Sequence, residues 1–239
     1  MGREPIHTWS NRRVHRCVVA AFTLLLVPIH PGFAAQQVHS PDKLTYIKVL
    51  KGSMPEYTQV TVDTDGVGSY QGRKLTDAPM PRPLKLSPAT TEALFNLAHA
   101  LGDFGSVDLE SHKNVADLGE KTFIYEHDGQ DHKAQFNFTQ NRQAQELEGL
   151  FEGIAGVEQH LGVLEYSVRY DRLGLPQELT QIEIDLNNNA LVDPELLTPM
   201  LEKIAANSQF LHIAQIRAED ILRRIQKIED PPKAGKSRF

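Results

Sequence analysis

Cysteine is almost absent from this 239-residue sequence, which contains Cys17 alone. Cys17 lies at the start of an apolar run, where it is badly placed for lipid attachment, and it precedes the cleavage position expected below. The mature chain is therefore expected to have no disulfide. About 200 residues suffice for one domain, or a domain with a sizeable extension, that relies on a hydrophobic core.

The sequence also lacks the short motifs that mark common enzyme sites. It contains no Gly-x-Ser-x-Gly elbow, no His-Glu-x-x-His pair and no phosphate-binding loop. Gly66, Gly68 and Gly72 superficially resemble a nucleotide loop, but their spacing is wrong and no helical pattern follows them. We predict no catalytic residue and no cofactor. An enzyme stays an alternative, because residues far apart in sequence can converge in space.

Basic residues are fewer than acidic ones, 25 against 31. The formal net charge is -6, and loss of residues 1–34, with four arginines and one glutamate, would make it -9. An acidic chain is poorly suited to phosphate backbones, so nucleic acid is not an expected partner.

No apolar run reaches the roughly 20 residues of a membrane-spanning helix. The longest, Cys17 to Val27, follows four arginines and precedes the small residues of Gly32-Phe33-Ala34. This pattern predicts a secretory signal peptide over residues 1–34, cleaved after Ala34, with no stable membrane span afterwards. A retained anchor and a twin-arginine signal at Arg12-Arg13 are the alternatives.

The clearest structural signal is a hairpin over Lys121 to Thr139, with two alternating strands joined across Asp128 and Gly129. A loop of residues 128–131 would make one side apolar and place opposite charges on the other. The expected pairs are Phe123 with Phe136, Tyr125 with Ala134, and Glu126 with Lys133.

Three further strands are predicted over residues 44–50, 57–62 and 67–71, the last two joined by a turn at Asp65-Gly66. Three alternating prolines indicate an extended connector over residues 73–85. Ser87-Pro88 should begin a helix that ends near Gly102. Asn141 should cap another, which Gly153 and Gly156 weaken and which a further periodic run extends to about residue 171.

Beyond Gly174 and Pro176 the pattern becomes helical, with an apolar stripe from Ala214 to Ile228 in the last helix. The predicted fold class is α+β: an antiparallel sheet with element order βββαββα covered by helices, followed by a C-terminal helical extension. The expected organisation is a flexible lead-in over 35–43, an α+β domain over 44–172, the extension over 173–228 and a disordered tail over 229–239.

Parts of this pattern resemble a known family. They are the run Thr61-Val62-Asp63-Thr64-Asp65-Gly66, the helix start Leu86-Ser87-Pro88-Ala89-Thr90, and Tyr125 leading into Gly129. With the element order of residues 44–155, they resemble emfourin-like inhibitors of thermolysin-type proteases, which are small exported bacterial domains. The resemblance implies an α+β binding module. It carries over no inhibitory residue and leaves Pro176 to Phe239 unexplained.

Two polar segments are candidate metal sites. In the expected hairpin register, His127 and His132 are directly opposed, with Asp128 or Asp131 beside them, as for a zinc or copper ion. Polar turn residues without metal are the alternative.

The second segment carries oxygen ligands at calcium-loop positions, namely Asp185, Asn187, Asn189 and Asp193. Ala190 replaces the sharp-turn glycine and Leu196 the bidentate glutamate of that pattern. The alternative is a polar interhelical loop in which Asp193 caps a helix begun by Pro194.

The connection over residues 103–120 is long enough to be a candidate recognition loop. Our leading hypothesis is a non-catalytic exported protein, periplasmic or extracellular, that binds a protein or envelope component through this loop or a sheet edge. The alternative is a structural or assembly protein that uses its C-terminal helices. Burial of the Ala214–Ile228 stripe against the strands would favour the first, and its exposure the second.

Overall fold

The structure, a computed structural model, describes residues 41–229. The expected signal peptide over 1–34, most of the lead-in and residues 230–239 of the tail lie outside the described residues. The described residues belong to one compact unit. Among them, no helix has an apolar stretch long enough to cross a membrane.

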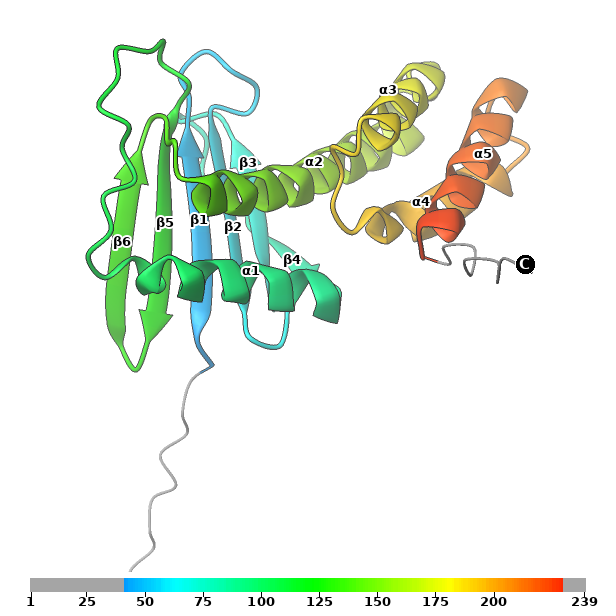
Figure 1. Ribbon diagram of the computed structural model, residues 1–239. Coiled ribbons are helices and arrows are strands. Elements are labelled where there is room, and N and C mark those ends of the chain that lie inside the picture. Colours follow the sequence, from blue (N-terminus) through cyan, green and yellow to red (C-terminus); the bar gives the residue numbers. More distant parts are fainter. Residues whose placement is uncertain (1–40, 230–239) are drawn as a thin grey trace, which may run out of the picture. The chain divides into compact units, whose positions relative to one another are not determined.

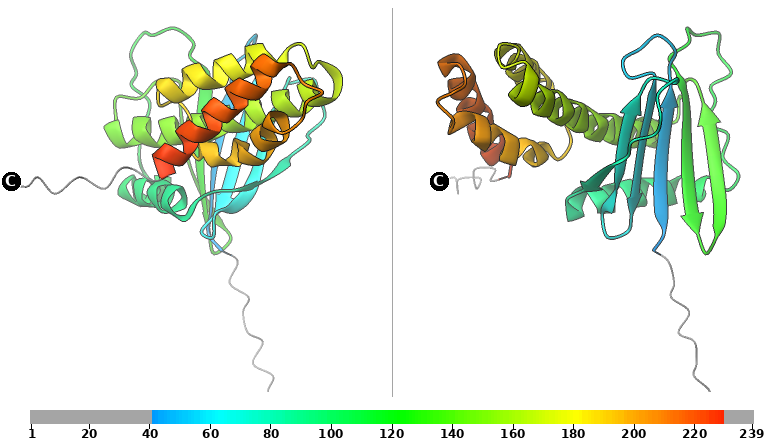
Figure 2. Two further views of the ribbon diagram at one scale, coloured as in Figure 1. Left: turned by 90° about the vertical axis from the view of Figure 1, so that its right-hand side faces the viewer. Right: turned by 180° about the vertical axis from the view of Figure 1, so that it is seen from behind.

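The first part of the chain forms a six-stranded antiparallel sheet with the strand order β4-β3-β2-β1-β5-β6 (Figure 1). The strands are β1 (Lys43–Val49), β2 (Tyr57–Asp63), β3 (Val67–Arg73), β4 (Arg82–Lys85), β5 (Glu120–His127) and β6 (Gln130–Phe136). Helices α1 (Pro88–Ala100) and α2 (Arg142–Tyr170) cover one face of the sheet (Figures 1 and 2). The α+β prediction is confirmed.

Alternation along the strands fills the space between the sheet and these helices. Tyr46 of β1 and Phe123 of β5 are fully buried, and their rings lie 5.7 Å apart between centroids. Phe151 of α2 stacks on Tyr46 at 5.2 Å. Such aromatic contacts add to the free energy gained by burying the rings.

The central hairpin is present, but its predicted register was wrong by two residues. Phe123 pairs with Ala134, and Lys121 pairs with Phe136. The turn is the two-residue Asp128–Gly129, whose φ angles of 50° and 76° fit a tight hairpin turn. A shift of two residues keeps each side chain on the same face of the sheet, so the prediction of the apolar face was correct. The predicted cross-strand pairs, including Glu126 with Lys133, were wrong.

The expected extended connector before α1 contains the additional short strand β4. Its four residues pair with β3 at the edge of the sheet, with Pro83 opposite Ser69. Proline has no backbone N–H to donate, and an edge strand tolerates this because one of its sides has no strand partner. The element order is therefore four strands, a helix, two strands and a helix, where three initial strands were expected.

Both predicted helix starts are confirmed. The Ser87 hydroxyl accepts the Thr90 N–H, and Pro88 is the first residue of α1. The Asn141 side chain accepts the N–H groups of Gln143 and Ala144 at the start of α2.

Helix α2 is continuous through Gly153 and Gly156. A Cβ atom on Gly153 would lie 2.5 Å from Cγ2 of Val192 and 3.2 Å from the carbonyl oxygen of Ala190. Gly153 has a low helix propensity, but its lack of a side chain lets the segment at residues 190–192 approach α2 closely.

Three ion pairs connect α2 to three different strands of the sheet. They join Glu148 to Lys121 of β5 at 3.2 Å, Glu152 to Lys48 of β1 at 3.0 Å, and Glu165 to Arg82 of β4 at 3.0 Å.

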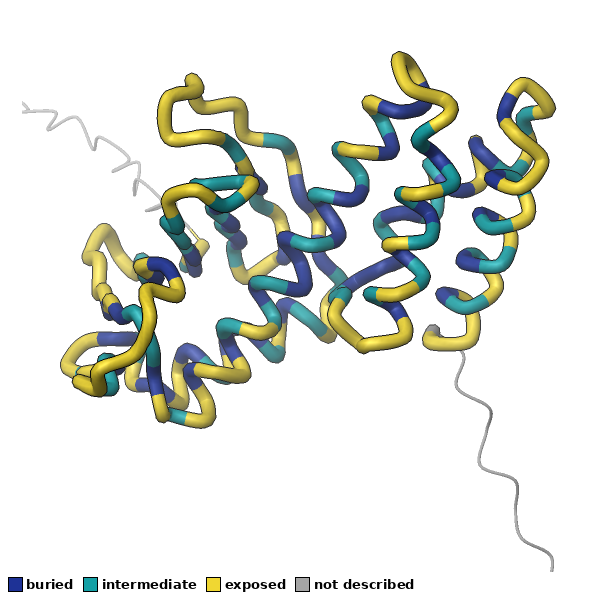
Figure 3. The backbone as a smooth tube through the Cα atoms, turned by 90° about the horizontal axis from the view of Figure 1, so that it is seen from above, coloured by how far each residue is buried: buried dark blue, intermediate teal, exposed yellow. Residues whose placement is uncertain are grey.

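The remaining elements are α3 (Leu175–Asn187), the 3₁₀ helix η2 (Pro194–Leu197), α4 (Thr198–Ala205) and α5 (His212–Glu229). They share a second hydrophobic cluster with the C-terminal half of α2, from Val157 onward. The N-terminal half of α2, up to Ala155, belongs to the cluster under the sheet. Buried positions therefore recur along the whole of α2 (Figure 3), and the packing changes within this helix before the expected boundary at 172/173.

The apolar stripe of α5 is buried from Ala214 to Ile225 and packs against α3 and α4, while Ile228 is 57% exposed. This stripe neither covers the sheet nor stands exposed, so it favours neither functional hypothesis.

Candidate functional site

The predicted recognition loop is held against the end of β6. The 3₁₀ helix η1 (Gly102–Phe104) occupies its start, and residues 105–119, called the 105–119 loop below, have no regular structure. Ser111 N–H donates to the carbonyl oxygen of Phe138 at 2.8 Å. The Asn137 side chain accepts the Leu118 N–H at 2.8 Å and donates to the Ala116 carbonyl oxygen at 3.0 Å. Two separate points of the loop are thus fixed to residues 137–138.

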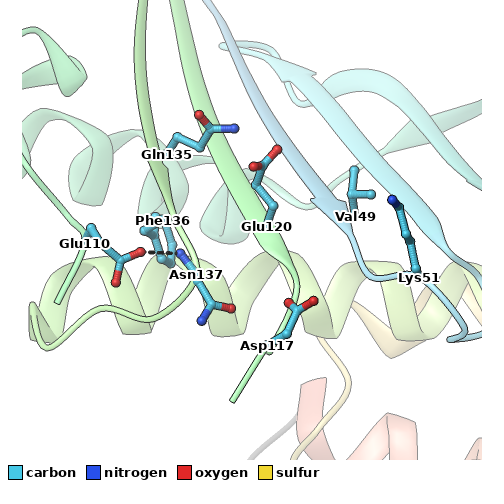
Figure 4. A pocket seen from close by; sticks show the side chains of 8 residues that line it. All are labelled: Val49, Lys51, Glu110, Asp117, Glu120, Gln135, Phe136 and Asn137. Atoms are coloured by element: carbon cyan, nitrogen blue, oxygen red, sulfur yellow. Dashed lines mark hydrogen bonds between the residues drawn. The ribbon is translucent and has the colours of Figure 1, made fainter. Parts of the chain in front are cut away.

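A cavity of about 650 Å³, called the acidic pocket below, opens between this loop and the ends of three strands. It is lined by Val49, Lys51, Glu110, Asp117, Glu120, Gln135, Phe136 and Asn137. Figure 4 shows Glu120 between Gln135 on one side and Val49 with Lys51 on the other. Loop and sheet therefore each supply one part of the wall.

Two of the three carboxylates that line the acidic pocket also hold the loop. Glu110 accepts the Asn137 N–H at 2.6 Å (Figure 4) and the Ser111 N–H at 2.8 Å. The Asn137 N–H, ahead of the opposing effect of desolvation, holds the pKa of Glu110 below its usual value. Asp117 accepts the Gly119 N–H at 2.9 Å. Backbone N–H groups thus stabilise the charged form of Glu110.

Three carboxylates face one amine, Lys51, so the acidic pocket carries an excess of negative charge. Its amides and carboxylates can accept hydrogen bonds from basic or polar groups. The excess of carboxylates suits recognition of a basic group.

Lys121, beside this pocket, was not predicted as a site residue. It is 4% exposed, donates to the carbonyl oxygen of Asn137 at 2.7 Å and pairs with Glu148 of α2 at 3.2 Å. The sequence contained a signal for it, because Lys121 shares the inward alternation of Phe123 and Tyr125. It positions the end of β6 rather than facing the cavity.

The two hairpin histidines are not directly opposed, as predicted, because the register differs by two residues. His127 lies opposite Gln130, His132 opposite Tyr125 and Asp131 opposite Glu126. His127 Nδ1 contacts Oδ1 of Asp42 at 2.7 Å, and a hydrogen bond to this carboxylate raises the pKa of His127.

Three of the four candidate calcium-loop side chains, Asp185, Asn187 and Asp193, make separate contacts. Helix α3 extends through Asn187, so Asp185 and Asn187 lie in a helix rather than in a loop. Asp185 contacts Nε2 of His160 at 2.9 Å, and Asn187 accepts from Arg224 at 2.9 Å. Within residues 41–229, no three histidine, cysteine or acidic side chains are arranged to hold a metal ion.

Asp193 was expected to cap the helix begun by Pro194, but its side chain makes no such cap. It accepts instead from Ser87 N–H at 2.7 Å and Ser87 Oγ at 2.9 Å, and also from the Thr90 hydroxyl. A carboxylate here is favoured because the N-terminus of α1 carries a partial positive charge. Asn189 lies in the same connection, with a φ of 52°.

No protein-family model matches the chain, and no curated protein matches it. The likeness to emfourin-like inhibitors thus stays a prediction from the sequence.

Proposed function

We propose that this protein is an exported, non-catalytic binding module that acts on another protein or an envelope component, in the periplasm or outside the cell. Its contact surface is the 105–119 loop together with strand β6. One observation carries this proposal: Ser111 and Asn137 anchor a long, exposed loop beside the edge of the sheet. A loop held in one arrangement before its partner arrives loses less conformational entropy on binding.

The edge position of β6 supports the same surface. β6 pairs with β5 on one side, and no other strand among the described residues pairs with its outer side. An extended segment of a partner can add to such an edge through backbone hydrogen bonds. Asp131 and Lys133 place charges on this strand, which discourages pairing between identical edges.

The acidic pocket gives this surface a preference for basic side chains. It lies where β6 ends, so a partner segment along β6 would bring its next side chains to Glu120 and Asp117. A lysine or arginine there would meet the excess of carboxylates. The resemblance to emfourin-like inhibitors supports an inhibitor-like module of this kind as the more specific form of the proposal.

The test is capture of a partner from the native envelope, with residues 35–239 as bait. Reversing two charges of the acidic pocket, Asp117→Lys with Glu120→Lys, should abolish capture, because the basic group would then meet like charges. The matched control is Glu202→Lys with Glu219→Lys, two exposed carboxylates of α4 and α5 that lie outside this surface. Label-free mass spectrometry of the captured proteins gives the comparison.

The control pair should capture the same proteins as the unchanged chain. Equal loss in both variants would mean that net charge alone drives capture, and undiminished capture by the pocket variant would place the contact elsewhere. Either result overturns the assignment of the surface.

The alternative, an assembly protein that uses its C-terminal helices, is favoured by a different observation. Leu211, Ile213 and Ile216 remain between 40% and 48% exposed at the start of α5. Cross-linking in the envelope separates the two functions. Partner cross-links from Lys51 and Lys113 support the loop surface, whereas cross-links from Lys203 and Lys227 support the helices.

A further inference from the structure

A second cavity, of about 510 Å³, lies between α2 and the sheet edge formed by β3 and β4. It shares no lining residue with the acidic pocket. Its rim is apolar and exposed: Met54 is 77%, Met80 80% and Tyr166 60% exposed. Methionine and tyrosine are enriched in binding surfaces, because they offer adaptable or rigid apolar area.

The same cavity is lined by a buried carboxylate, Glu158 of α2, which is 4% exposed. Within residues 41–229, its Oε2 atom accepts no hydrogen bond. The nearest cationic atom is Nε of Arg82, at 3.6 Å, an ion-pair contact too long for a hydrogen bond. A buried carboxylate in this condition is costly, and each such group in a folded protein needs an explanation.

Competition for Arg82 explains why Oε2 of Glu158 lacks a donor. Both terminal nitrogens of Arg82 donate to the carboxylate of Glu165, at 3.2 and 3.0 Å, which makes a bidentate ion pair. The three groups, two carboxylates and one guanidinium, carry a formal charge of -1. Desolvation raises the pKa of Glu158, Arg82 opposes this effect and Glu165 adds to it.

We infer that this cavity binds an alkylammonium group, whose N–H donates to Oε2 of Glu158 and whose aliphatic chain packs against Met54, Met80, Val163 and Tyr166. One monovalent cation would neutralise the net charge of -1 of these three groups, of which Glu158 is the buried one, and would supply the missing hydrogen bond. A volume of about 510 Å³ falls within the roughly 300–1,000 Å³ of typical ligand pockets.

Two further basic residues, Arg73 and Lys74, line the cavity together with Asp77. Arg73 Nη1 donates to three carbonyl oxygens of residues 74–77, and its guanidinium lies 4.4 Å from the centre of the Tyr57 ring. Asp77 lies beside Lys74 in the same turn, and its carboxylate accepts the Lys74 N–H. Nε of Arg73 is nevertheless buried without a hydrogen-bond partner among residues 41–229. The net charge of -1 belongs to the three groups at Arg82.

Methionine methyl NMR tests this inference, because Met54 and Met80 lie on the rim while Met200 lies in α4. Hexylammonium should shift the Met54 and Met80 signals and leave Met200 unmoved, and neutral hexanol should bind at least about tenfold more weakly. A capped tripeptide with a central lysine distinguishes the source of the ammonium. Tighter binding of the peptide identifies a lysine side chain, and tighter binding of the free amine identifies a small molecule.

Glu158→Gln keeps the shape of the side chain and should weaken hexylammonium about tenfold without changing hexanol binding. Tyr166→Ala, at an exposed position, shortens the apolar wall and should weaken hexylammonium more than ethylammonium. The Tyr166→Ala variant provides a second test if Glu158→Gln does not fold. Equal binding of hexanol and hexylammonium, unmoved rim signals, or undiminished affinity in both variants would overturn the inference.

Discussion

Asp193 holds two distant parts of the chain together through one carboxylate. It is 7% exposed and lies 106 residues from Ser87, whose N–H and hydroxyl it accepts. Its φ of 55° is left-handed, a region that aspartate and asparagine tolerate better than most residues. Both backbone geometry and hydrogen bonding therefore favour an Asp or Asn at this position.

We predict that Asp193→Ala lowers the free energy of unfolding by about 3 kcal/mol, because it leaves donors at the start of α1 unpaired. Asp193→Asn keeps one acceptor oxygen and the left-handed backbone, so it should cost only about 1 kcal/mol. Urea unfolding measures both. Equal losses in the two variants would mean that the negative charge, rather than the geometry, is the essential feature.

The same principle applies to Lys121 and Glu158, two charged residues that are each 4% exposed. Lys121 has both a carboxylate and a carbonyl partner, so it is satisfied within the chain. Oε2 of Glu158 has no hydrogen-bond donor among residues 41–229, which is why Glu158 points to a ligand and Lys121 does not.

At the scale of elements, α2 shows how glycines can mark contact rather than weakness. Nothing lies within 4 Å of a Cβ atom built on Gly149, whereas one on Gly153 would overlap Val192. The two glycines share one helix and thus a similar intrinsic penalty of about 1 kcal/mol relative to alanine.

We predict opposite effects from alanine at these two positions. Gly149→Ala should raise the free energy of unfolding by about 0.5–1 kcal/mol, since it gains only helix propensity. Gly153→Ala should lower it by about 1–3 kcal/mol, because the new methyl group displaces the segment at Val192. Urea unfolding of both variants measures the contrast.

Adding Val192→Ala to Gly153→Ala removes the side chain that the new methyl group would meet. This change should restore part of the lost stability. A stabilising Gly153→Ala variant on its own would show that the segment before η2 moves away at little cost.

At the scale of the whole molecule, α2 joins the sheet core to the helical core, and His160 lies at this junction. His160 is buried between Glu178 and Asp185 of α3, whose oxygens lie 2.7 Å from Nδ1 and 2.9 Å from Nε2. Desolvation by itself lowers the pKa of His160, but the hydrogen bonds and charges of Glu178 and then Asp185 outweigh it and raise the pKa. The charged imidazolium can donate to both carboxylates at once, which a neutral ring cannot do.

A raised folded-state pKa means that this stabilisation is complete below the unfolded-state value of about 6.5 and is lost as pH rises through the folded-state value. The free energy of unfolding should therefore fall as the pH rises above about 6.5. His160→Gln should remove most of this fall. Urea unfolding across this pH range measures it.

His112→Gln is the matched control, because His112 also has a raised pKa, from its hydrogen bond with Asp108, but is exposed to solvent. It should leave the pH dependence almost unchanged, since exposed pairs contribute little. An unaltered pH dependence in His160→Gln would refute a role for this contact between α2 and α3.

The amino-acid sequence by itself determined what depends on neighbours along the chain. Alternation from Lys121 to Phe136 specified the hairpin and its buried face, and the chemistry of Ser87 and Asn141 specified two helix starts. A long connection over residues 103–120 was also visible, so a recognition loop was expected there, whereas the acidic pocket that this loop lines was not.

Only the tertiary structure decided which groups meet across large sequence separations. Glu158 and Arg82, like Asp193 and Ser87, come together because α2 and the segment after α3 pack against the strand domain. The hairpin register differed because a two-residue shift keeps the same faces buried, so the hydrophobic pattern could not discriminate between the two pairings. Local patterns fix which face of an element is buried, whereas the partner of a buried charge is set by the packing of whole elements.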